Sequence, residues 1–456
     1  MMLIVLKLVL ALGDGLLGVW VLRNGAFEKW AEATFQWRMA ALQGIPAIAL
    51  FVGLYLIGHQ EVTSDVPGYY LPAAHAVLAG KLPFRDFMLS YAPLFPYVGA
   101  ALVGIWDSGK MFALFAILVN AVALILWHRM GCLCLDRQTA RQSTVVFATS
   151  GHLLLQALLG TNQVWIGAAL AASALLIVMD RPVTSGLLQA VAAGTTKLLV
   201  PLFWPVLWIC TGRRWRWLAM ALLPVAALYA AFAGAGADVF YPLRFEGNLI
   251  TSGNLPYLLD PWLGLADAAK RVLFDAALLG ALGATTLWLF VRIRPLTTQQ
   301  RAAALPAALA LTGVVFLLMS KKSYTGYAVF VMYPIAAVLG IGLRKWRARV
   351  GFLLAFNTLL ATEPSLWFHL GGFDKTLHEW LATGGGSAAT GFILVDVALL
   401  ACYVWVAWVS VGCIRRTTAG AMISSNASQS ATACSLVKRA SANSRARVPI
   451  DSSLPG

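Results

Sequence analysis

The sequence predicts an all-α, polytopic membrane protein, and three features of its 456 residues support this prediction. Hydrophobic residues make up 60% of the chain and charged residues only 12%, about half the charged fraction of an ordinary soluble domain. Apolar runs long enough to cross roughly 30 Å of hydrocarbon recur along the sequence. The alternating strands of about ten residues that would build a membrane β-barrel are missing from it.

The net charge of +15 could indicate a nucleic-acid partner. The lysines and arginines, however, fall in short connections between apolar runs, which is the distribution that the positive-inside rule describes. We therefore expect the lipid bilayer, and no nucleic acid, as the partner of these charges.

The chain divides into three predicted parts. Residues 1–41 hold an apolar helix, with no small-x-small cleavage site behind it, and a cytoplasmic connection. Residues 42–416 form one transmembrane domain of about 11 to 13 helices. Residues 417–456, rich in Ser and Ala with scattered Arg, predict a disordered cytoplasmic tail.

Basic residues predict the orientation of these helices. Arg23, Lys29 and Arg38 precede the apolar run at 42–58, so this connection is expected inside and the next one, 59–110, becomes a large first outer loop. Further outer loops are expected at 159–163, 235–270, 320–325 and 368–387. This orientation requires that two apolar segments do not cross the membrane as single spans. The segment 93–106 stays at the surface as a short interfacial helix, and 184–210 enters and returns as two short helices that meet near Lys197.

The first outer loop carries the strongest candidate for chemistry, in the segment "TSDVPGYYLPAAHAVLAGKLPF". Asp65 either caps a helix over 67–78 or, at the membrane–water interface, accepts a proton from an acceptor hydroxyl. Tyr69 and Tyr70 either anchor the chain at the interface or stack on a sugar ring. The candidates for substrate binding in this loop are Glu61, Tyr69, Tyr70, Asp86 and Tyr91.

Lysines on the predicted outer side are the second set of candidates. Lys321 and Lys322 run against the inside bias of the other basic clusters, and Lys197 lies between two short helix halves. A lysine at the centre of a membrane helix costs about 2.5–3.5 kcal/mol, so such residues are functional candidates, with snorkelling to headgroups as the alternative. Together with Arg85, these lysines are candidates for binding an anionic group.

The remaining outer loops add Arg244, Asn248, Tyr324 and His369 as candidates for substrate binding. The histidine spacing predicts no metal site, and we expect no cofactor, although a divalent metal is compatible with the chemistry. Cys132 and Cys134 have no nearby Cys or His cluster in their loop to complete a zinc site, so we interpret them as incidental. Outer loops without paired cysteines predict no disulfide framework.

The order of several motifs resembles a known family. Asp-x-x-x-Tyr, then "LPFRDF" and Tyr-x-Pro-Leu in the first loop are similar to the integral-membrane glycosyltransferases of the GT-C superfamily, especially the GT87-like, polyprenyl-phosphate-mannose-dependent branch. The resemblance includes "GTTKLLVPLFWPVLW" at 194–208 and "SKKSYTGYAVFVMYP" at 320–334, and extends to about residue 413.

The resemblance implies a reaction on the periplasmic face of a bacterial inner membrane. A sugar, with mannose favoured, would pass from a polyprenyl phosphate to a hydroxyl of a glycolipid, glycan or protein, with inversion, and Asp65 would act as the base. The phosphate of the donor would be bound by Lys197, Lys321, Lys322 and Arg85. The family's pair of adjacent carboxylates is missing here, and Asp86 or Asp107 would replace it.

Two other functions remain open. Lys197 in a broken helix is also typical of a solute transporter or lipid flippase. A polymerase or ligase of O-antigen chains would likewise use long outer loops and basic residues.

Overall fold

The computed structural model describes residues 2–342, 346–370, 372, 377, 379 and 386–419, and helices dominate these ranges. Within them the β-type pairing is limited to an isolated bridge between Pro83 and Phe87. The all-α class is therefore confirmed for the described residues. The predicted tail begins inside the last helix, which ends at Thr418, and residues 420–456 lie outside the described part of the chain.

The first half of the chain comprises α1 (Met2–Asn24), η1 (Ala26–Lys29), α2 (Glu32–Phe51), η2 (Val52–Ile57), η3 (Val66–Tyr70), α3 (Leu71–Leu78), α4 (Phe95–Ile105), α5 (Lys110–Cys134), α6 (Arg137–Ala148), α7 (Gly151–Leu158), α8 (Gln163–Val178), α9 (Pro182–Thr195), η4 (Val200–Phe203) and α10 (Trp204–Cys210). The second half comprises α11 (Arg214–Gly234), α12 (Tyr241–Gly247), α13 (Leu255–Leu259), η5 (Asp260–Trp262), α14 (Asp267–Ile293), α15 (Thr298–Met319), η6 (Thr325–Val331), α16 (Met332–Gly342), α17 (Trp346–His369) and α19 (Gly386–Thr418).

Among the described residues, seven helices are long and apolar enough to cross a membrane, and an eighth span results if the bent pair α7 and α8 is counted as one. The seven are Val5–Asn24, Glu32–Ile57, Lys110–Cys134, Arg214–Gly234, Asp267–Ile293, Thr298–Met319 and Ala389–Thr418. A multi-pass membrane protein is therefore supported, whereas the larger number of 11 to 13 membrane helices stays a prediction.

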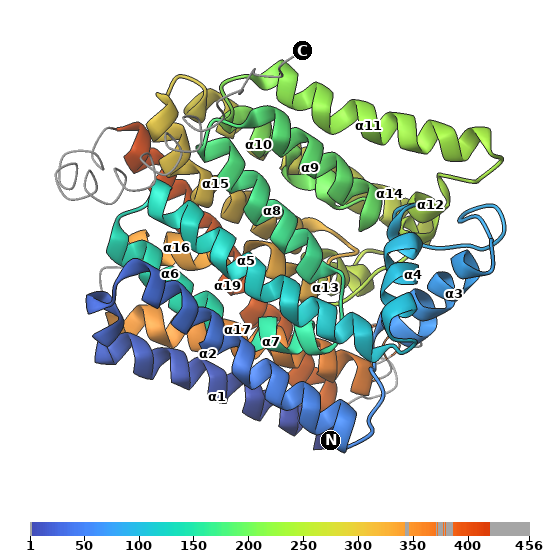
Figure 1. Cartoon of the computed structure of the whole chain (residues 1–456), viewed down its shortest axis with the longest axis horizontal. Helices are drawn as coiled ribbons and strands as arrows, with labels where there is room; N and C mark the ends of the chain where they lie inside the picture. The colour runs from blue at the N-terminus through green and yellow to red at the C-terminus, as the bar shows by residue number, and fades with distance from the viewer. Residues whose placement is uncertain are drawn as a thin grey trace, which may run out of the picture.

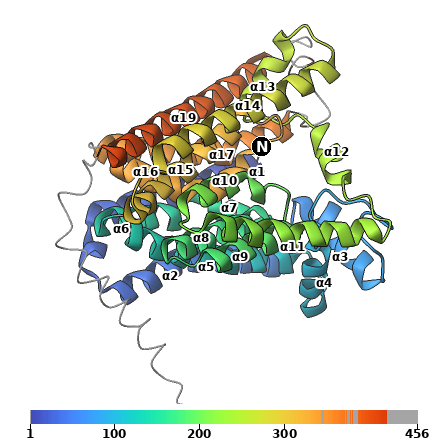
Figure 2. The same ribbon diagram turned by 90° about the horizontal axis from the view of Figure 1, so that it is seen from above.

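The long helices form two layers (Figure 2). In one layer α9 packs against both α8 and α11, and α5 packs against α8; in the other, α15 packs against α14 and α19, and α17 against α19. Helix α15 lies at the centre, with 72% of its most apolar stretch buried, whereas the corresponding share is 11% in α11 and α14. The exposed apolar faces of these two helices are suited to contact with lipid.

The N-terminal helices belong to the same bundle. Helix α1 packs against α17, α7 and α6, and the predicted boundary between residues 41 and 42 falls inside α2, which continues without interruption from Glu32 to Phe51. Helices α1 and α2 therefore pack together with the rest of the chain.

Short helices gather at one end of the bundle, where α3, α4 and α12 lie together on the right of Figure 1. The short helix expected at 93–106 is present as α4, and the one expected at 67–78 is present as η3 followed by α3. The run 184–210 is broken around Lys197 into α9 and the shorter η4 and α10, as predicted. Pro201, which lacks an N–H donor, follows this break as the second residue of η4.

Candidate active site

Asp65 is half-buried and precedes η3. Its Oδ2 accepts a hydrogen bond of 2.5 Å from the Tyr91 hydroxyl, and its side chain makes no capping bond to the helix. The neighbouring Ser64 is the residue that caps the turn, since its Oγ accepts from Val66 N at 3.2 Å. The alternative in which Asp65 serves only as a helix cap is therefore wrong.

Tyr91 holds this carboxylate from a buried position. Its ring stacks on Phe95 at 4.7 Å and meets the ring of Tyr70 edge-on at 5.0 Å. Burial raises the pKa of the Tyr91 hydroxyl well above its usual value, with the negative charge of Asp65 acting in the same direction. The phenol therefore remains protonated and donates to Asp65 at neutral pH.

Tyr70 is fully buried, and its hydroxyl accepts a hydrogen bond of 3.3 Å from the backbone N–H of Asn162. The ring is enclosed by Tyr91, Phe95 and Phe112. It cannot stack on a sugar or anchor at the interface, which corrects both predictions for this residue. Its neighbour Tyr69 is 45% exposed and keeps an accessible ring.

The break between α9 and η4 places Lys197 beside Tyr91. Helix α9 ends where the Thr195 and Thr196 hydroxyls bond back to carbonyls four residues earlier. The carbonyls freed at this end accept from the segment that follows Tyr91: Ala92 N–H donates to Thr196 O at 3.0 Å and Leu94 N–H to Gly194 O at 2.9 Å. Two segments about a hundred residues apart in sequence are thus joined by their backbones.

Lys197 is only 6% exposed, and its partners are aromatic. Its Nζ lies 4.5 Å from the centre of the Tyr91 ring and donates to the Tyr327 hydroxyl at 3.4 Å. Within the described residues no carboxylate forms an ion pair with it. Its ammonium lies against ring faces and is therefore available to an incoming anion.

Lys322 completes the group from the segment between α15 and η6. Its Nζ lies 2.9 Å from Glu246 Oε2 and donates to the Tyr324 hydroxyl at 3.3 Å. Burial lowers the pKa of Lys322. The carboxylate of Glu246 raises this pKa, and the positive charge of Lys197 lowers it further. The Tyr324 and Tyr327 rings meet edge-on at 5.6 Å and so connect the two lysines. We call Asp65, Tyr91, Lys197, Glu246, Lys322, Tyr324 and Tyr327 the Asp65 cluster.

Hydrogen bonds from Thr251 and Asn254 fix the segment that carries Lys322. Thr251 N–H donates to Lys321 O at 2.8 Å, and the buried Asn254 amide donates to Thr251 O and Ser323 O. Asn254 also caps α13 by accepting from Tyr257 N at 3.0 Å. The polar residues of 251–257 therefore hold the loop in place.

Lys321 points away from its neighbour. Its Nζ lies 2.7 Å from Asp275 Oδ2 on α14 and donates to Arg271 O at 3.3 Å. Lys321 is therefore engaged outside the Asp65 cluster, and of the two adjacent lysines only Lys322 has a contact within it.

The other candidates from the sequence have partners of their own or are exposed. Arg85 pairs with Asp86 at 2.9 Å, and this guanidinium lowers the pKa of Asp86 to about 2. The remaining pairs are Glu61 with Lys110 at 3.3 Å, Asp107 with His75 at 2.7 Å, Arg244 with Asp238, and Asn248 with Arg271 at 3.0 Å. His369, at the end of α17, is exposed.

Glu246 and Tyr327 are members of the cluster that the sequence did not single out. Glu246 stood among several polar residues of one loop, and nothing local distinguishes it. Tyr327 follows Tyr324 by three residues, the spacing of one helical turn. That spacing places both tyrosines on one side of a helical turn, and it could have indicated that Tyr327 belongs with Tyr324.

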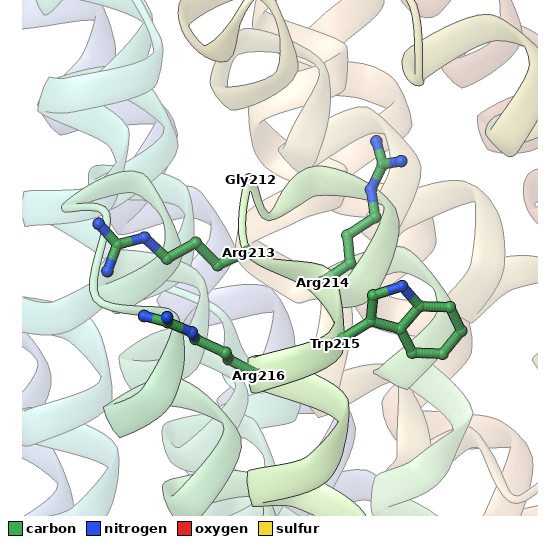
Figure 3. A pocket seen from close by; sticks show the side chains of 5 residues that line it. All are labelled: Gly212, Arg213, Arg214, Trp215 and Arg216. Atoms are coloured by element: carbon green, nitrogen blue, oxygen red, sulfur yellow. The ribbon is translucent and has the colours of Figure 1, made fainter.

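A surface hollow of about 530 Å³ lies elsewhere. It is lined by Gly212, Arg213, Arg214, Trp215 and Arg216 at the turn between α10 and α11, and no member of the Asp65 cluster borders it (Figure 3). The candidate site is thus identified by its polar contacts and not by the size of a cavity.

The comparisons with known proteins leave the family of this chain unassigned. No model of a protein family matches the chain, and no curated protein matches it in sequence. Three potential metal ligands meet, within the described residues, at Glu32, His128 and Cys132 and not around Asp65. The chemistry of the site therefore follows from its own residues.

Proposed function

We propose that this protein is a GT-C-like membrane glycosyltransferase that moves a sugar, with mannose favoured, from a polyprenyl phosphate to a hydroxyl of a glycolipid, glycan or protein. One observation carries the proposal: a half-buried carboxylate, oriented by a tyrosine, shares a site with two lysines that come from distant segments. The reaction would occur on the extracytoplasmic face of a bacterial inner membrane.

Asp65 is the base in this proposal. Tyr91 occupies Oδ2, which leaves Oδ1 to accept the proton of the acceptor hydroxyl. The acceptor oxygen bonds to the anomeric carbon as the bond from that carbon to the phosphate oxygen breaks. The electron pair of this bond stays on the phosphate, the proton ends on Asp65, and the anomeric configuration inverts.

Lys197 and Lys322 stabilise the departing lipid phosphate. Charge develops on the phosphate oxygen as the bond breaks, and fixed cations in a water-poor site favour that charge without reorganisation. Lys197 has no carboxylate partner among the described contacts, whereas Glu246 neutralises part of the charge of Lys322. Lys197 is therefore the stronger candidate for stabilising the transition state.

The test is a transfer assay with purified protein in liposomes that contain a polyprenyl-phosphate sugar and a glycolipid acceptor. The proposal predicts one lipid phosphate released for each sugar transferred, with mannose, glucose, arabinose and galacturonic acid compared as donors. A transporter or flippase, which the broken helix at Lys197 also suits, would move solute or lipid across the bilayer without consuming it. A polymerase or ligase would use a lipid-linked glycan chain as its donor.

Tyr91→Phe is expected to lower kcat by about 10-fold, roughly 1.4 kcal/mol, because Asp65 loses its orienting hydrogen bond while the ring keeps its packing. Measuring kcat together with thermal unfolding on the same preparation checks this result. A loss of stability with an unchanged kcat would reduce Tyr91 to a packing role.

The adjacent lysines offer a matched pair. Lys322→Ala is expected to raise the KM for the lipid donor by about 10-fold, since one charge-assisted contact to the phosphate is lost. Lys321→Ala should leave this KM unchanged, because Lys321 pairs with Asp275. Steady-state kinetics with varied donor concentration distinguishes the two, and equal effects of both substitutions would contradict the assignment.

A further inference from the structure

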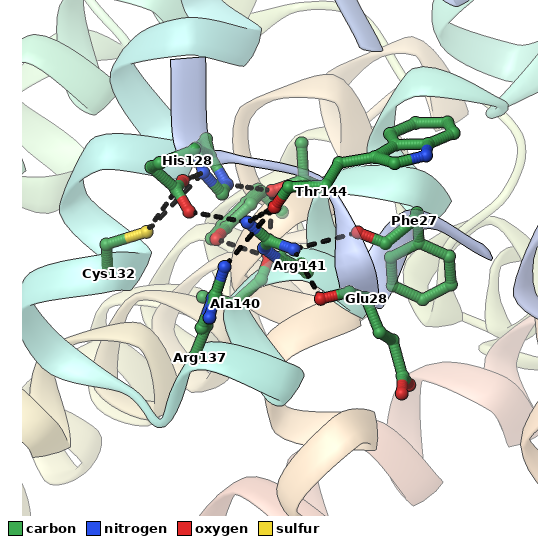
Figure 4. A network of polar contacts seen from close by, with 11 residues as sticks. Phe27, Glu28, His128, Cys132, Arg137, Ala140, Arg141 and Thr144 are labelled. Carbon is green, nitrogen blue, oxygen red and sulfur yellow. Dashed lines mark hydrogen bonds and ion pairs between the residues drawn. The ribbon is translucent and has the colours of Figure 1, made fainter. Parts of the chain in front are cut away.

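A second polar cluster lies near the other end of α5 and joins three helices (Figure 4). His128 and Cys132 are four residues apart on α5, Glu32 begins α2, and Arg141 and Thr144 belong to α6. Eighteen residues separate His128 from the start of α5 at Lys110, which is roughly 27 Å along a helix. The start of α5 packs beside Val66, the residue that follows Asp65. Asp65 therefore lies near one end of α5, and the cluster around His128 lies near the other end.

Hydrogen-bond directions determine which ring nitrogen of His128 carries a proton. The Thr144 hydroxyl donates its single proton to Ala140 O at 2.8 Å, so it accepts from His128 Nδ1 at 2.7 Å. Nδ1 is therefore protonated, and Nε2 faces Glu32 Oε1 in close contact. With the proton on Nδ1, either a second proton or a metal ion on Nε2 would face the carboxylate of Glu32.

The sulfur of Cys132 has the position of a third ligand. Its Sγ lies 3.4 Å from His128 Nε2 and 3.6 Å from Glu32 Oε1. A tetrahedral zinc ion with bonds of about 2.3 Å to sulfur and 2.0–2.1 Å to nitrogen or oxygen separates its ligand atoms by roughly 3.5 Å. Both sulfur distances match this separation, whereas His128 Nε2 and Glu32 Oε1 lie closer together and would move apart when an ion binds. Residues four apart on a helix share one face, which is how α5 presents both side chains together.

The residues behind these ligands have the arrangement that metal sites require. Thr144 accepts the outer N–H of His128, and Arg141 Nη2 holds Glu32 Oε2 at 2.8 Å, which leaves Oε1 directed at the ring. Cys132 is exposed and the Glu32 side chain is 42% exposed, so an ion has a path of entry.

We propose that Glu32, His128 and Cys132 bind a divalent transition-metal ion, with Zn²⁺ the ion preferred by this mixture of sulfur, nitrogen and oxygen ligands. The ion would replace two protons, one on His128 Nε2 and one on Cys132 Sγ, so the summed charge of the cluster stays unchanged. A water molecule would complete the tetrahedron. This proposal gives Cys132 the role of a ligand in place of our interpretation of it as incidental.

Such an ion would fasten the connection between α1 and α2 to the bundle. Arg141 already donates to the carbonyls of Phe27, Glu28 and Trp30 at 2.8–2.9 Å, and the ion would fix Glu32 at the end of the same connection. Such an ion would stabilise the folded protein, and this effect is independent of the proposed transferase activity.

The test uses tag-free, full-length protein in detergent, stripped with a chelator and titrated with Co²⁺. We expect one saturable site per chain with a thiolate-to-cobalt charge-transfer band, and displacement of the cobalt by Zn²⁺. Cys132→Ser should abolish the band, and Thr144→Val should weaken binding by about 10–100-fold because His128 loses its orienting partner. Thermal unfolding with and without Zn²⁺ should show a stabilisation that Cys132→Ser removes.

Cys134→Ser is the matched control, since it removes a neighbouring thiol and should leave the band and the affinity unchanged. The absence of a saturable band, or a band that survives Cys132→Ser, would overturn the proposal and leave a direct hydrogen bond between His128 and Glu32. Because Cys132 is exposed, its conversion to Ser is compatible with folding, and the test does not depend on the more disruptive His128→Ala.

Discussion

Asp65→Asn is expected to lower the rate of sugar transfer by about 10²–10⁴-fold, the usual contribution of a general base. The amide keeps the size of the carboxylate and can still accept the hydrogen bond from Tyr91, so the loss would reflect chemistry and not packing. The measurement is kcat in the liposome assay, with thermal unfolding recorded on the same preparation.

Asp86→Asn provides the matched control for Asp65. It removes a carboxylate from the same connection between α2 and α5, but one that is paired with Arg85 at the surface. We expect turnover within about 2-fold of the unmodified protein, because surface ion pairs contribute little. Near-normal turnover in Asp65→Asn, or an equal loss in Asp86→Asn, would remove Asp65 from the role of base.

Lys197→Met is expected to lower kcat by about 10²–10³-fold, the effect of removing one preorganised group that stabilises developing negative charge. Methionine preserves an unbranched chain between the Tyr91 and Tyr327 rings but carries no charge. Because a buried ammonium is costly, the variant should unfold at the same temperature or higher. Kinetics and unfolding together separate a catalytic lysine from a structural one.

Lys81→Met is the corresponding control, an exposed lysine of the connection between α2 and α5. It should retain full activity. If Lys197→Met also retained kcat, Lys197 would be a lysine that the aromatic contacts merely accommodate. The alternative in which it snorkels to lipid headgroups conflicts with its contacts, since its ammonium points at two buried rings.

Local features of the chain could be predicted because their causes are local. The break at Lys197 follows from two threonines and a nearby proline, and the short helix Phe95–Ile105 follows from prolines at its beginning. These predictions required only the pattern of residues within one or two turns. The topology predicted from the basic residues also carries Asp65 and Lys197 to the same face of the membrane.

The pairings within the site could not be predicted in this way. Lys321 and Lys322 are adjacent, and only the path of the chain after α15 decides that one faces Asp275 and the other Glu246. Asp65 was a candidate for the helix cap, and the positions of Ser64 and Tyr91 decided against that role.

The sequence by itself determined that this protein is a bundle of apolar helices and where several of them are interrupted, because hydropathy and helix-breaking residues act over short stretches. The tertiary structure alone decided which polar groups meet. It joins Asp65 to Tyr91 and Tyr91 to Lys197, and it brings Glu32 to His128 from 96 residues away. The physical reason is that helix packing, and not sequence separation, sets the distance between side chains on different helices.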